Sequence, residues 1–281
     1  MICFPNAKIN LGLNIVSKRT DGYHNIETIF YPIALKDALE ILPSSDRKAY
    51  RLYETGIDIY SRGEQNLVVK ALSLLGEQRD IPNIDIHLLK NIPCGAGLGG
   101  GSSNATFMLK LLNETYSLGY TNSELMEFAI SLGADCTFFL KNKPVFANGI
   151  GDNLVDINLS LDDYFIVVVK PNISVSTKEA YASITPKQPA VSLIEIVKKP
   201  INEWRNLMHN DFETPIFKKH PVIGDIKQSL YDQGAVYASM SGSGTSVYGL
   251  FEKKPSICIS EVFADYFVWK NYILTHNTNL K

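Results

Sequence analysis

Apolar and polar residues alternate strictly near the start of the chain. In AKINLGLNI, residues 7–15, every odd position is apolar, and the even positions carry a lysine, two asparagines and a glycine. A period of two residues is that of a β-strand with one face toward a core. The pattern predicts a half-buried strand that places Lys8 and Asn10 on its polar face. A second apolar run, YHNIETIFYPIAL, predicts another strand before Asp37.

The next segments alternate between helical and extended patterns. Apolar residues have helical spacing in NLVVKALSLL, residues 66–75, whereas IDIHLL, residues 84–89, is typical of a strand. The glycine-rich stretch PCGAGLGGGSSNA, residues 93–105, comes next and leads into a helical pattern, and a further helix is predicted to end at Gly133. The stretch therefore lies between a strand and the N-terminus of a helix, a position that a flexible linker does not occupy.

The second half of the chain is richer in strands. KPVFANGIGDNLVDI predicts a strand, a turn and a strand, and after a polar segment YFIVVVKP predicts the first strand of a new unit. AVYASMSGSGTSVYGLFE predicts two strands paired across a Ser/Gly turn. We expect one domain over residues 1–155 and a second over residues 156–281. Strands and helices in both halves predict an α/β or α+β fold with two lobes.

Composition narrows the function classes. The chain has 281 residues, of which 45% are hydrophobic and 20% charged, as in an ordinary soluble enzyme. Its net charge of -2 creates no strong attraction for nucleic acid or an anionic membrane. Scattered cysteines without a CxxC pair suit a reducing cytoplasm and argue against a zinc site. No signal peptide is recognisable, and no run reaches the roughly 18 apolar residues of a membrane helix.

The glycine-rich stretch has a physical interpretation of its own. Gly95, Gly97 and Gly100 match GxGxxG, but the dinucleotide-binding fold requires a second strand after the helix, and here a second helix is predicted. A lysine after the glycines, which a P-loop requires, is absent. Glycine backbone can approach an anion closely, and a helix N-terminus offers free N–H groups and partial positive charge. The stretch therefore predicts a polyphosphate site, with a serine-capped tight turn as the structural alternative.

Two charged residues complete a candidate set for phosphoryl transfer. Asp135 follows a helix-ending glycine in SLGADCTFF, where an ordinary N-cap is the alternative explanation. Lys8 lies in the middle of the first strand, where a solvent-facing lysine is the alternative. A lysine, an aspartate and a phosphate cradle in one chain are the minimum set for a kinase.

TDGYHNIETIF adds an aromatic residue and a histidine beside a glycine. Tyr23 and His24 could recognise a ring, or Tyr23 could pack in the turn that begins a strand. His24 has no second histidine or cysteine nearby, which argues against a metal ligand.

Three separated segments, taken together, resemble the three motifs of the GHMP kinases. They are PNAKINLGLNIVSKRTDGYHNIETIF, PCGAGLGGGSSNA and SMSGSGTSVYGLF. DGYH and GLGGGSSNA are most similar to the branch of the family that phosphorylates a CDP-linked sugar alcohol, CDP-methylerythritol, and NDFE at residues 210–213 resembles the NDLE of that branch. The resemblance implies a two-lobed α/β (α+β) fold with a ribosomal protein S5 domain 2-like N-terminal lobe and a ferredoxin-like C-terminal lobe.

The resemblance also implies roles for residues. Asp135, the aspartate of the GAD motif, corresponds to the catalytic base, with Lys8 beside it. The implied ATP-binding residues are Asn66, Lys90, Pro93, Gly95, Ala96, Gly97, Leu98, Gly99, Gly100, Gly101, Ser102 and Ser103. The implied substrate-binding residues are Asn10, Tyr23, His24, Phe30, Thr177 and Tyr181, with Tyr23 and His24 holding the cytosine and Tyr181 stacking on its other face.

The sequence departs from the branch at two places. The usual GADVPFF has Cys136 and Thr137 in place of Val-Pro, which removes a proline suited to the first helical turn but keeps the carboxylate. The usual Pro-Thr-Pro before the stacking aromatic is replaced by Ser176-Thr177-Lys178.

The resemblance implies ATP with Mg²⁺ as cofactor and a monomer or homodimer that takes a small-molecule substrate. The metal ligands remain unassigned. Two alternatives stay open: a sister GHMP kinase acting on homoserine or mevalonate, and a non-catalytic nucleotide-binding paralogue. DGYH argues against the first alternative because those substrates have no cytosine, and the presence of both Lys8 and Asp135 argues against the second.

Overall fold

The computed structural model describes residues 1–46, 48–57, 66–255 and 259–273. Three four-stranded sheets make up the β-structure of these residues. The first sheet has the order β1 (Ile2–Cys3), β4 (Ala38–Pro43), β6 (Ile84–Lys90), β5 (Tyr50–Gly56). The second has the order β2 (Asn6–Lys18), β3 (His24–Lys36), β7 (Val145–Asn148), β8 (Asn153–Asp156). The third has the order β10 (Tyr237–Met240), β11 (Val247–Phe251), β9 (Phe165–Lys170), β12 (Phe267–Tyr272).

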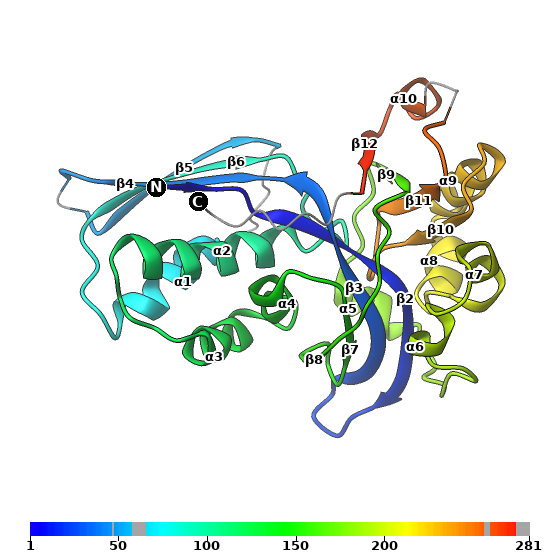
Figure 1. Ribbon diagram of the computed structural model, residues 1–281, viewed down its shortest axis with the longest axis horizontal. Helices are drawn as coiled ribbons and strands as arrows, with labels where there is room; N and C mark the ends of the chain where they lie inside the picture. Colours follow the sequence, from blue (N-terminus) through cyan, green and yellow to red (C-terminus); the bar gives the residue numbers. More distant parts are fainter. Residues whose placement is uncertain (47, 58–65, 256–258, 274–281) are drawn as a thin grey trace.

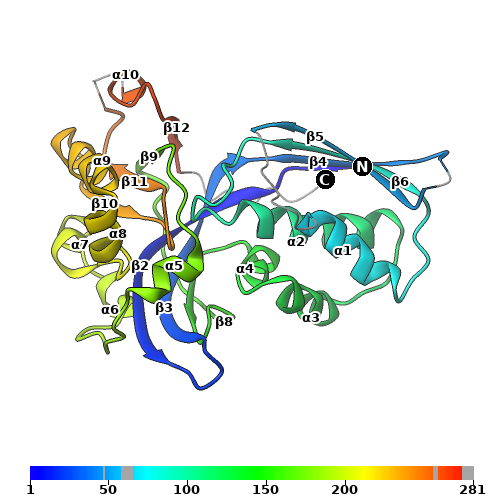
Figure 2. The ribbon, with the colours of Figure 1, turned by 180° about the vertical axis from the view of Figure 1, so that it is seen from behind.

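Helices cover one side of the first and third sheets (Figures 1 and 2). The N-terminal lobe carries α1 (Leu67–Gly76), α2 (Gly100–Thr115), α3 (Asn122–Leu132) and α4 (Cys136–Lys141). The C-terminal lobe carries α5 (Thr177–Ala182), α6 (Leu193–Ile196), α7 (Ile201–Leu207), α8 (Glu213–Lys219), α9 (Pro221–Asp232) and α10 (Ile259–Val262). Every strand and helix predicted from the apolar pattern is present, and α2 is followed by α3 rather than by a strand, as the rejection of the dinucleotide-binding fold requires.

The third sheet has the strand order of a ferredoxin-like unit. Its four strands pair antiparallel throughout, and if they are numbered 1 to 4 along the chain their order across the sheet is 2-3-1-4. The predicted ferredoxin-like character of the C-terminal lobe is therefore confirmed. The boundary at residue 155 falls within β8, which still pairs with β7 of the second sheet, and the new sheet begins with β9. The exact division of the chain at that residue stays a prediction.

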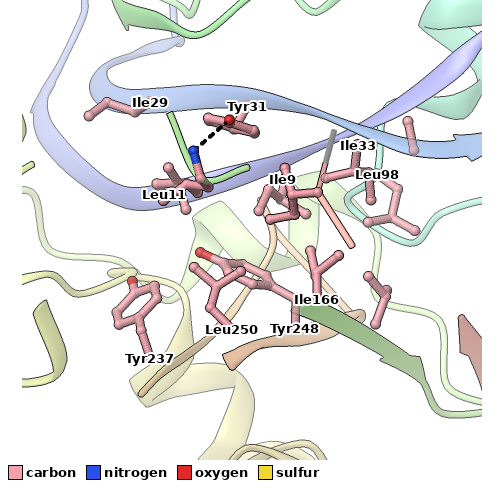
Figure 3. Close-up of a cluster of buried hydrophobic side chains, with 14 of the residues drawn as sticks. Ile9, Leu11, Ile29, Tyr31, Ile33, Leu98, Ile166, Tyr237, Tyr248 and Leu250 are labelled. Atoms are coloured by element: carbon pink, nitrogen blue, oxygen red, sulfur yellow. Dashed lines mark hydrogen bonds between the residues drawn. The ribbon is translucent and has the colours of Figure 1, made fainter. Parts of the chain in front are cut away.

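The long hairpin of β2 and β3 joins the two lobes (Figure 1). Figure 3 shows Ile9 of β2 and Tyr31 of β3 above side chains of the third sheet, among them Ile166 and Tyr248. The Tyr31 hydroxyl accepts a hydrogen bond of 2.9 Å from the backbone N–H of Leu161 on the segment that enters the C-terminal lobe. The lobes thus share one apolar core, and burial of that surface holds their relative position.

The prediction of a half-buried β2 is wrong. Lys8 and Asn10, on the polar face, are 3% and 2% exposed, so the strand is buried on both sides. A register shift lies between Leu11 and Leu13 at Gly12, whose φ is +67°. Before this bulge the apolar side chains join the core between the lobes, and after it they join a second core under α8 and α9. The polar face points into a cavity instead of toward bulk solvent.

Candidate active site

A cavity of about 830 Å³ opens between the two lobes. This size lies within the range of small-molecule sites. It is lined by the β2–β3 hairpin, the glycine-rich stretch with the start of α2, the N-terminus of α4, and α5 with the turn 242–244. The predicted site residues that line it are Lys8, Asn10, Tyr23, Phe30, Asn66, Lys90, Pro93, Gly95, Ala96, Gly97, Gly99, Gly100, Gly101, Ser102, Asp135, Thr177 and Tyr181. Residues from opposite ends of the sequence therefore meet at one site.

Lys8 and Asp135 face each other across this cavity. The Lys8 Nζ atom lies 3.3 Å from Oδ2 of Asp135 and donates a 2.7 Å hydrogen bond to Oδ1 of Asn10. The same ammonium group lies 4.9 Å from the ring centroid of Phe30, a cation–π distance. The Lys8 side chain is buried, whereas that of Asp135 is 37% exposed. Asp135 is thus open to a ligand on one side and held by a cation on the other.

The Asp135 side chain does not serve as a helix cap. The residue occupies the N-cap position of α4, but its side chain accepts no capping hydrogen bond there. The ordinary N-cap explanation for Asp135 is therefore excluded by the geometry.

Helix α2 fixes the short helix that Asp135 precedes. The Thr106 hydroxyl donates to the carbonyl of Cys136, and Lys110 Nζ donates to the carbonyls of Phe139 and Leu140 at 2.9 and 3.0 Å. The two Lys110 bonds satisfy carbonyl groups in the last turn of α4 that have no partner within the helix, and the Thr106 bond holds its first residue. The carboxylate of Asp135 therefore has a rigid support.

The glycine-rich stretch forms a tight loop with its backbone toward the cavity. Gly95, Gly97 and Gly99 have φ values of +59°, +75° and +71°, which favour glycine. A Cβ atom on Gly97 would lie 1.9 Å from the carbonyl oxygen of Ser241, so the two backbones touch. Helix α2 then begins at Gly100, with its first N–H groups at the end of the loop. This combination of close backbone and helix N-terminus suits an anionic polyphosphate.

Lys90 has a role that the sequence did not reveal. Its Nζ atom forms a buried ion pair with Asp37 Oδ2 and donates a 2.8 Å hydrogen bond to Asn104 Oδ1. The Asp37 carboxylate also accepts the backbone N–H groups of Asn91 and Ile92, at 2.7 and 2.9 Å, and the Asn104 amide. One buried carboxylate therefore ties the entry of the loop to the first turn of α2. Lys90 borders the cavity, but its charge is paired behind the loop.

The three polar residues after the glycines point in different directions. Ser102 lines the cavity, whereas Asn104 is committed to the ion pair behind the loop. Ser103 is fully buried, and its hydroxyl has no hydrogen-bond partner among the described residues. Leu98 belongs to the core between the lobes (Figure 3), although its carbonyl accepts the N–H of Lys8. Neither Ser103 nor Leu98 lines the cavity.

Asn66 lies at the rim of the cavity as the N-cap of α1. Its Oδ1 accepts the backbone N–H of Val68 at 2.9 Å, and its amide donates to Glu54. Both polar atoms of the side chain thus have intramolecular partners. A contact with adenosine stays a prediction.

Aromatic side chains gather in one part of the cavity, called here the aromatic end, although His24 itself does not line the cavity. The rings of His24 and Tyr181 are stacked, with centroids 4.8 Å apart and 16° between their planes. Burial, and to a lesser degree the charge of Asp135, raises the pKa of Tyr181 to about 12, so its hydroxyl stays protonated at neutral pH. Tyr23 is 62% exposed and lines the cavity. The Thr177 hydroxyl lies 3.4 Å from that of Ser243, within hydrogen-bond reach. The residues predicted to hold a cytosine are thus neighbours.

Sequence reasoning missed the residues that connect these parts. The Ser241 hydroxyl donates to the carbonyl of Gly97 at 2.8 Å and accepts the N–H of Asn10 at 3.2 Å. Phe212 lines the aromatic end, and the ring of Tyr181 packs edge-on against it at 4.9 Å. Both residues lie in quoted motifs, SMSGSG and NDFE, so the signal was present. Their contacts depend on the way the lobes meet.

The family models assign the chain. The GHMP kinases N terminal domain matches residues 66–143, and the GHMP kinases C terminal domain matches residues 192–266. The chain belongs to the GHMP kinase family. This GHMP kinase has the two-lobed fold that its motifs predicted, and members of the family use ATP to phosphorylate small molecules.

Relatives of this GHMP kinase carry a common name. The 4-diphosphocytidyl-2-C-methyl-D-erythritol kinase of Parabacteroides distasonis is 55% identical over 273 residues, covering 97% of this chain and 100% of the relative. A crystal structure of 4-(cytidine 5'-diphospho)-2C-methyl-D-erythritol kinase superposes with a TM-score of 0.81 at 31% identity, covering 96% of this chain and 98% of that one. Mevalonate kinase of Methanococcus jannaschii, at 15% identity and a TM-score of 0.70 over 98% of each chain, shares the fold.

A single methyl group on Gly97 tests the contact between the loop and Ser241. Gly97→Ala places a Cβ atom against a backbone carbonyl at a positive φ, so the loop must move. We expect the affinity for an ATP analogue, measured by calorimetry, to fall at least tenfold, which corresponds to about 1.4 kcal/mol. Gly95→Ala is the matched control because a Cβ atom there meets nothing within 4 Å, although its φ is also positive. Equal effects of the two substitutions would contradict the role of the contact.

The buried Lys110 predicts how the stability of the folded protein depends on pH. Burial lowers the pKa of Lys110 from 10.5 to about 8 in the folded protein. Between these two values the unfolded chain holds the extra proton, so raising the pH favours the folded state. The nearby Cys3 thiol, whose pKa burial raises to about 12, stays neutral across the interval.

The measurement compares wild type with Lys110→Met by urea unfolding from pH 7 to pH 10. Other groups titrate equally in both proteins and cancel. We expect the stability of the wild type relative to the variant to rise above pH 8 by at most about 1.4 kcal/mol per pH unit. A difference that is flat or falls with pH would show that Lys110 does not lose its proton in the folded state.

Proposed function

We propose that this GHMP kinase transfers the γ-phosphoryl group of ATP to the 2-hydroxyl of 4-diphosphocytidyl-2-C-methyl-D-erythritol, in the non-mevalonate route to isoprenoid precursors. The observation that carries the proposal is one cavity that contains a glycine-rich phosphate loop, a Lys8–Asp135 pair and an aromatic end. The names of relatives at 44–55% identity support the choice of substrate. Their alignments extend over most of the chain.

The triphosphate of ATP would lie along residues 95–101 and the first turn of α2. Backbone N–H groups there bind phosphate oxygens without the desolvation cost of a further buried cation. Asp135 would accept a hydrogen bond from the acceptor hydroxyl and then its proton. Lys8 would offset charge on the transferring group. Phosphoryl transfer depends mainly on positioning and electrostatics, so a rigid Asp135 matters more than its basicity.

The donor set fits Mg²⁺, which supplies charge neutralisation on the phosphates when bound. Magnesium in kinases takes one or two protein oxygen atoms and fills its shell with phosphate and water. The Asp135 carboxylate and the Ser102 hydroxyl both line the cavity beside the loop and would hold it. Among the described residues no group of three or more His, Cys, Asp or Glu could form an all-protein cage, so these two oxygen ligands are our candidates.

The aromatic end would hold the cytosine. Tyr23 lies in the turn before β3, His24 is the first residue of that strand, and Tyr181 belongs to α5 of the other lobe. In the structure His24 itself stacks on Tyr181. At a centroid distance of 4.8 Å, no room is left for a base between His24 and Tyr181. The base would therefore stack on Tyr181 either in place of His24 or beside it. We favour Tyr23 as the opposite wall because it lines the cavity and is exposed.

Other expectations are unchanged by the structure. Location in the cytoplasm, a monomer or homodimer, and the lack of a nucleic-acid partner stay predictions. In the described ranges, none of the helices combines the length and apolar character that crossing a bilayer requires.

The substrate assignment is tested by ADP release from purified protein. We expect turnover with CDP-methylerythritol and at least 100-fold lower kcat/KM, on the order of 3 kcal/mol, with homoserine or mevalonate, because neither fills the aromatic end. CDP should compete more strongly than UDP, because the proposed substrate carries cytosine and stacking alone does not distinguish the two bases. Comparable turnover with homoserine or mevalonate would reassign the enzyme to a sister GHMP kinase, and absence of turnover with all three would favour a non-catalytic paralogue.

The role of Asp135 is tested separately. Asp135→Ala removes the proposed proton acceptor, and general-base contributions are typically on the order of 10²–10⁴-fold. We expect kcat to fall by that factor while an ATP analogue still binds. Asp163→Ala, at an exposed aspartate before β9, is the control for loss of a negative charge. Near-normal kcat in Asp135→Ala would remove the residue from the mechanism.

A further inference from the structure

The segment Asn210–Glu213, with the sequence NDFE, docks on β2 from the opposite lobe. It follows α7, and Asn210 forms a parallel β-bridge with Leu13. The N–H of Leu13 donates to the carbonyl of His209, and the N–H of Asp211 donates to the carbonyl of Leu13, both at 2.9 Å. The Asp211 carboxylate also accepts the N–H of Ile15 at 2.7 Å. The segment is therefore fixed to the strand that carries Lys8 and Asn10.

Asn210 holds the turn that touches the phosphate loop. Its side chain is buried, and its amide donates two hydrogen bonds of 2.8 Å, to the carbonyls of Met240 and Gly242. Its Oδ1 atom accepts the N–H of Phe212 at 3.0 Å. The two carbonyls lie on either side of Ser241, the residue in contact with Gly97. The amide of Asn210 thus fixes the backbone that presents Ser241 to the loop.

Glu213 holds the same turn from the other side. Its Oε1 atom accepts the N–H of Met240 at 2.8 Å and the Ser239 hydroxyl at 3.0 Å. Lys227 of α9 donates to its Oε2 at 2.6 Å. The end of β10 is therefore held by side chains at both ends of the NDFE segment.

Phe212 contributes to the aromatic end of the cavity. Its ring meets that of Tyr181 at 4.9 Å with 86° between the planes, an edge-to-face contact. His24 stacks on Tyr181 as well, so two neighbours set the orientation of this ring. Phe212 lines the cavity but is otherwise buried. The resembling branch has leucine at this position, and leucine cannot make the edge-to-face contact.

We propose that the NDFE segment positions both ligand subsites. Asn210 is a positioning residue for the ATP phosphates, acting through Met240, Gly242 and Ser241 on the loop. Phe212 is a positioning residue for the nucleobase, acting through Tyr181. The assignment of the two subsites rests on the proposed function. Two side chains that are two residues apart then adjust different ligands, because the contacts of Asn210 lead to the loop and those of Phe212 lead to Tyr181.

The test separates the two ligands by titration. An ATP analogue and CDP are each titrated calorimetrically into wild type, Asn210→Asp and Phe212→Leu. Asn210→Asp replaces the double N–H donor with an oxygen that repels the two carbonyls, so we expect the Kd for the ATP analogue to rise roughly 5- to 100-fold. Phe212→Leu removes the edge-to-face contact, so we expect the Kd for CDP to rise roughly 2- to 10-fold. For each variant, the Kd for the other ligand should change less than twofold.

Two further variants guard against a merely structural explanation. Phe263→Leu changes a buried phenylalanine of the same core that does not line the cavity, and it should lower the melting temperature without a shift in either Kd. If Asn210→Asp fails to fold, Ser241→Ala tests the same connection. It should raise the Kd for the ATP analogue and leave the Kd for CDP unchanged. The proposal would be overturned if the Asn210 and Phe212 variants raised the Kd values for both ligands equally or raised neither. Wild type that binds the ATP analogue but not CDP would instead contradict the proposed function.

Discussion

The carbonyl of Ser241 lies where a side chain on Gly97 would begin, at 1.9 Å from an ideal Cβ. This contact between two backbones places the glycine-rich loop of one lobe, the proposed phosphate site, directly on a turn of the other. The shape of the loop depends on that turn. The turn itself is held by hydrogen bonds from Asn210 and to Glu213. The glycine at 97 is therefore required by the way the lobes meet, in addition to any ligand.

The distribution of positive charge follows from the same arrangement. The loop has no lysine of its own, and Lys90 beside it is neutralised by Asp37 in a buried pair. Lys8, from a strand far away in the sequence, is the buried cation next to Asp135. A cation that already paired with a structural carboxylate would add little to phosphate binding. One lysine thus shapes the loop, and the other lies beside Asp135, where the proposed phosphoryl transfer would take place.

Periodicity was sufficient to predict the elements, because each strand and helix buries a regular apolar face. It placed Lys8 and Asn10 on one face, and the bond between them confirms this. The same pattern led to a solvent-facing surface for β2, since an alternating strand cannot reveal that a second lobe covers its polar side. Ser103 and Asn104 illustrate a second limit. Their direction depends on how α2 packs against α1, α4 and β2, and no local pattern encodes that packing.

The departure from GADVPFF shows how the site tolerates a change that looks severe in the sequence. Thr137 occupies the position of the usual proline, and its hydroxyl donates a 2.8 Å hydrogen bond to the carbonyl of Ala134. This side-chain hydrogen bond restrains the first turn around Asp135. A proline at this position would restrain the same turn by fixing its own φ angle. Thr106 and Lys110 of α2 hold the rest of α4. Because α2 begins at the phosphate loop, one rigid helix links the loop to Asp135, and the proline is dispensable.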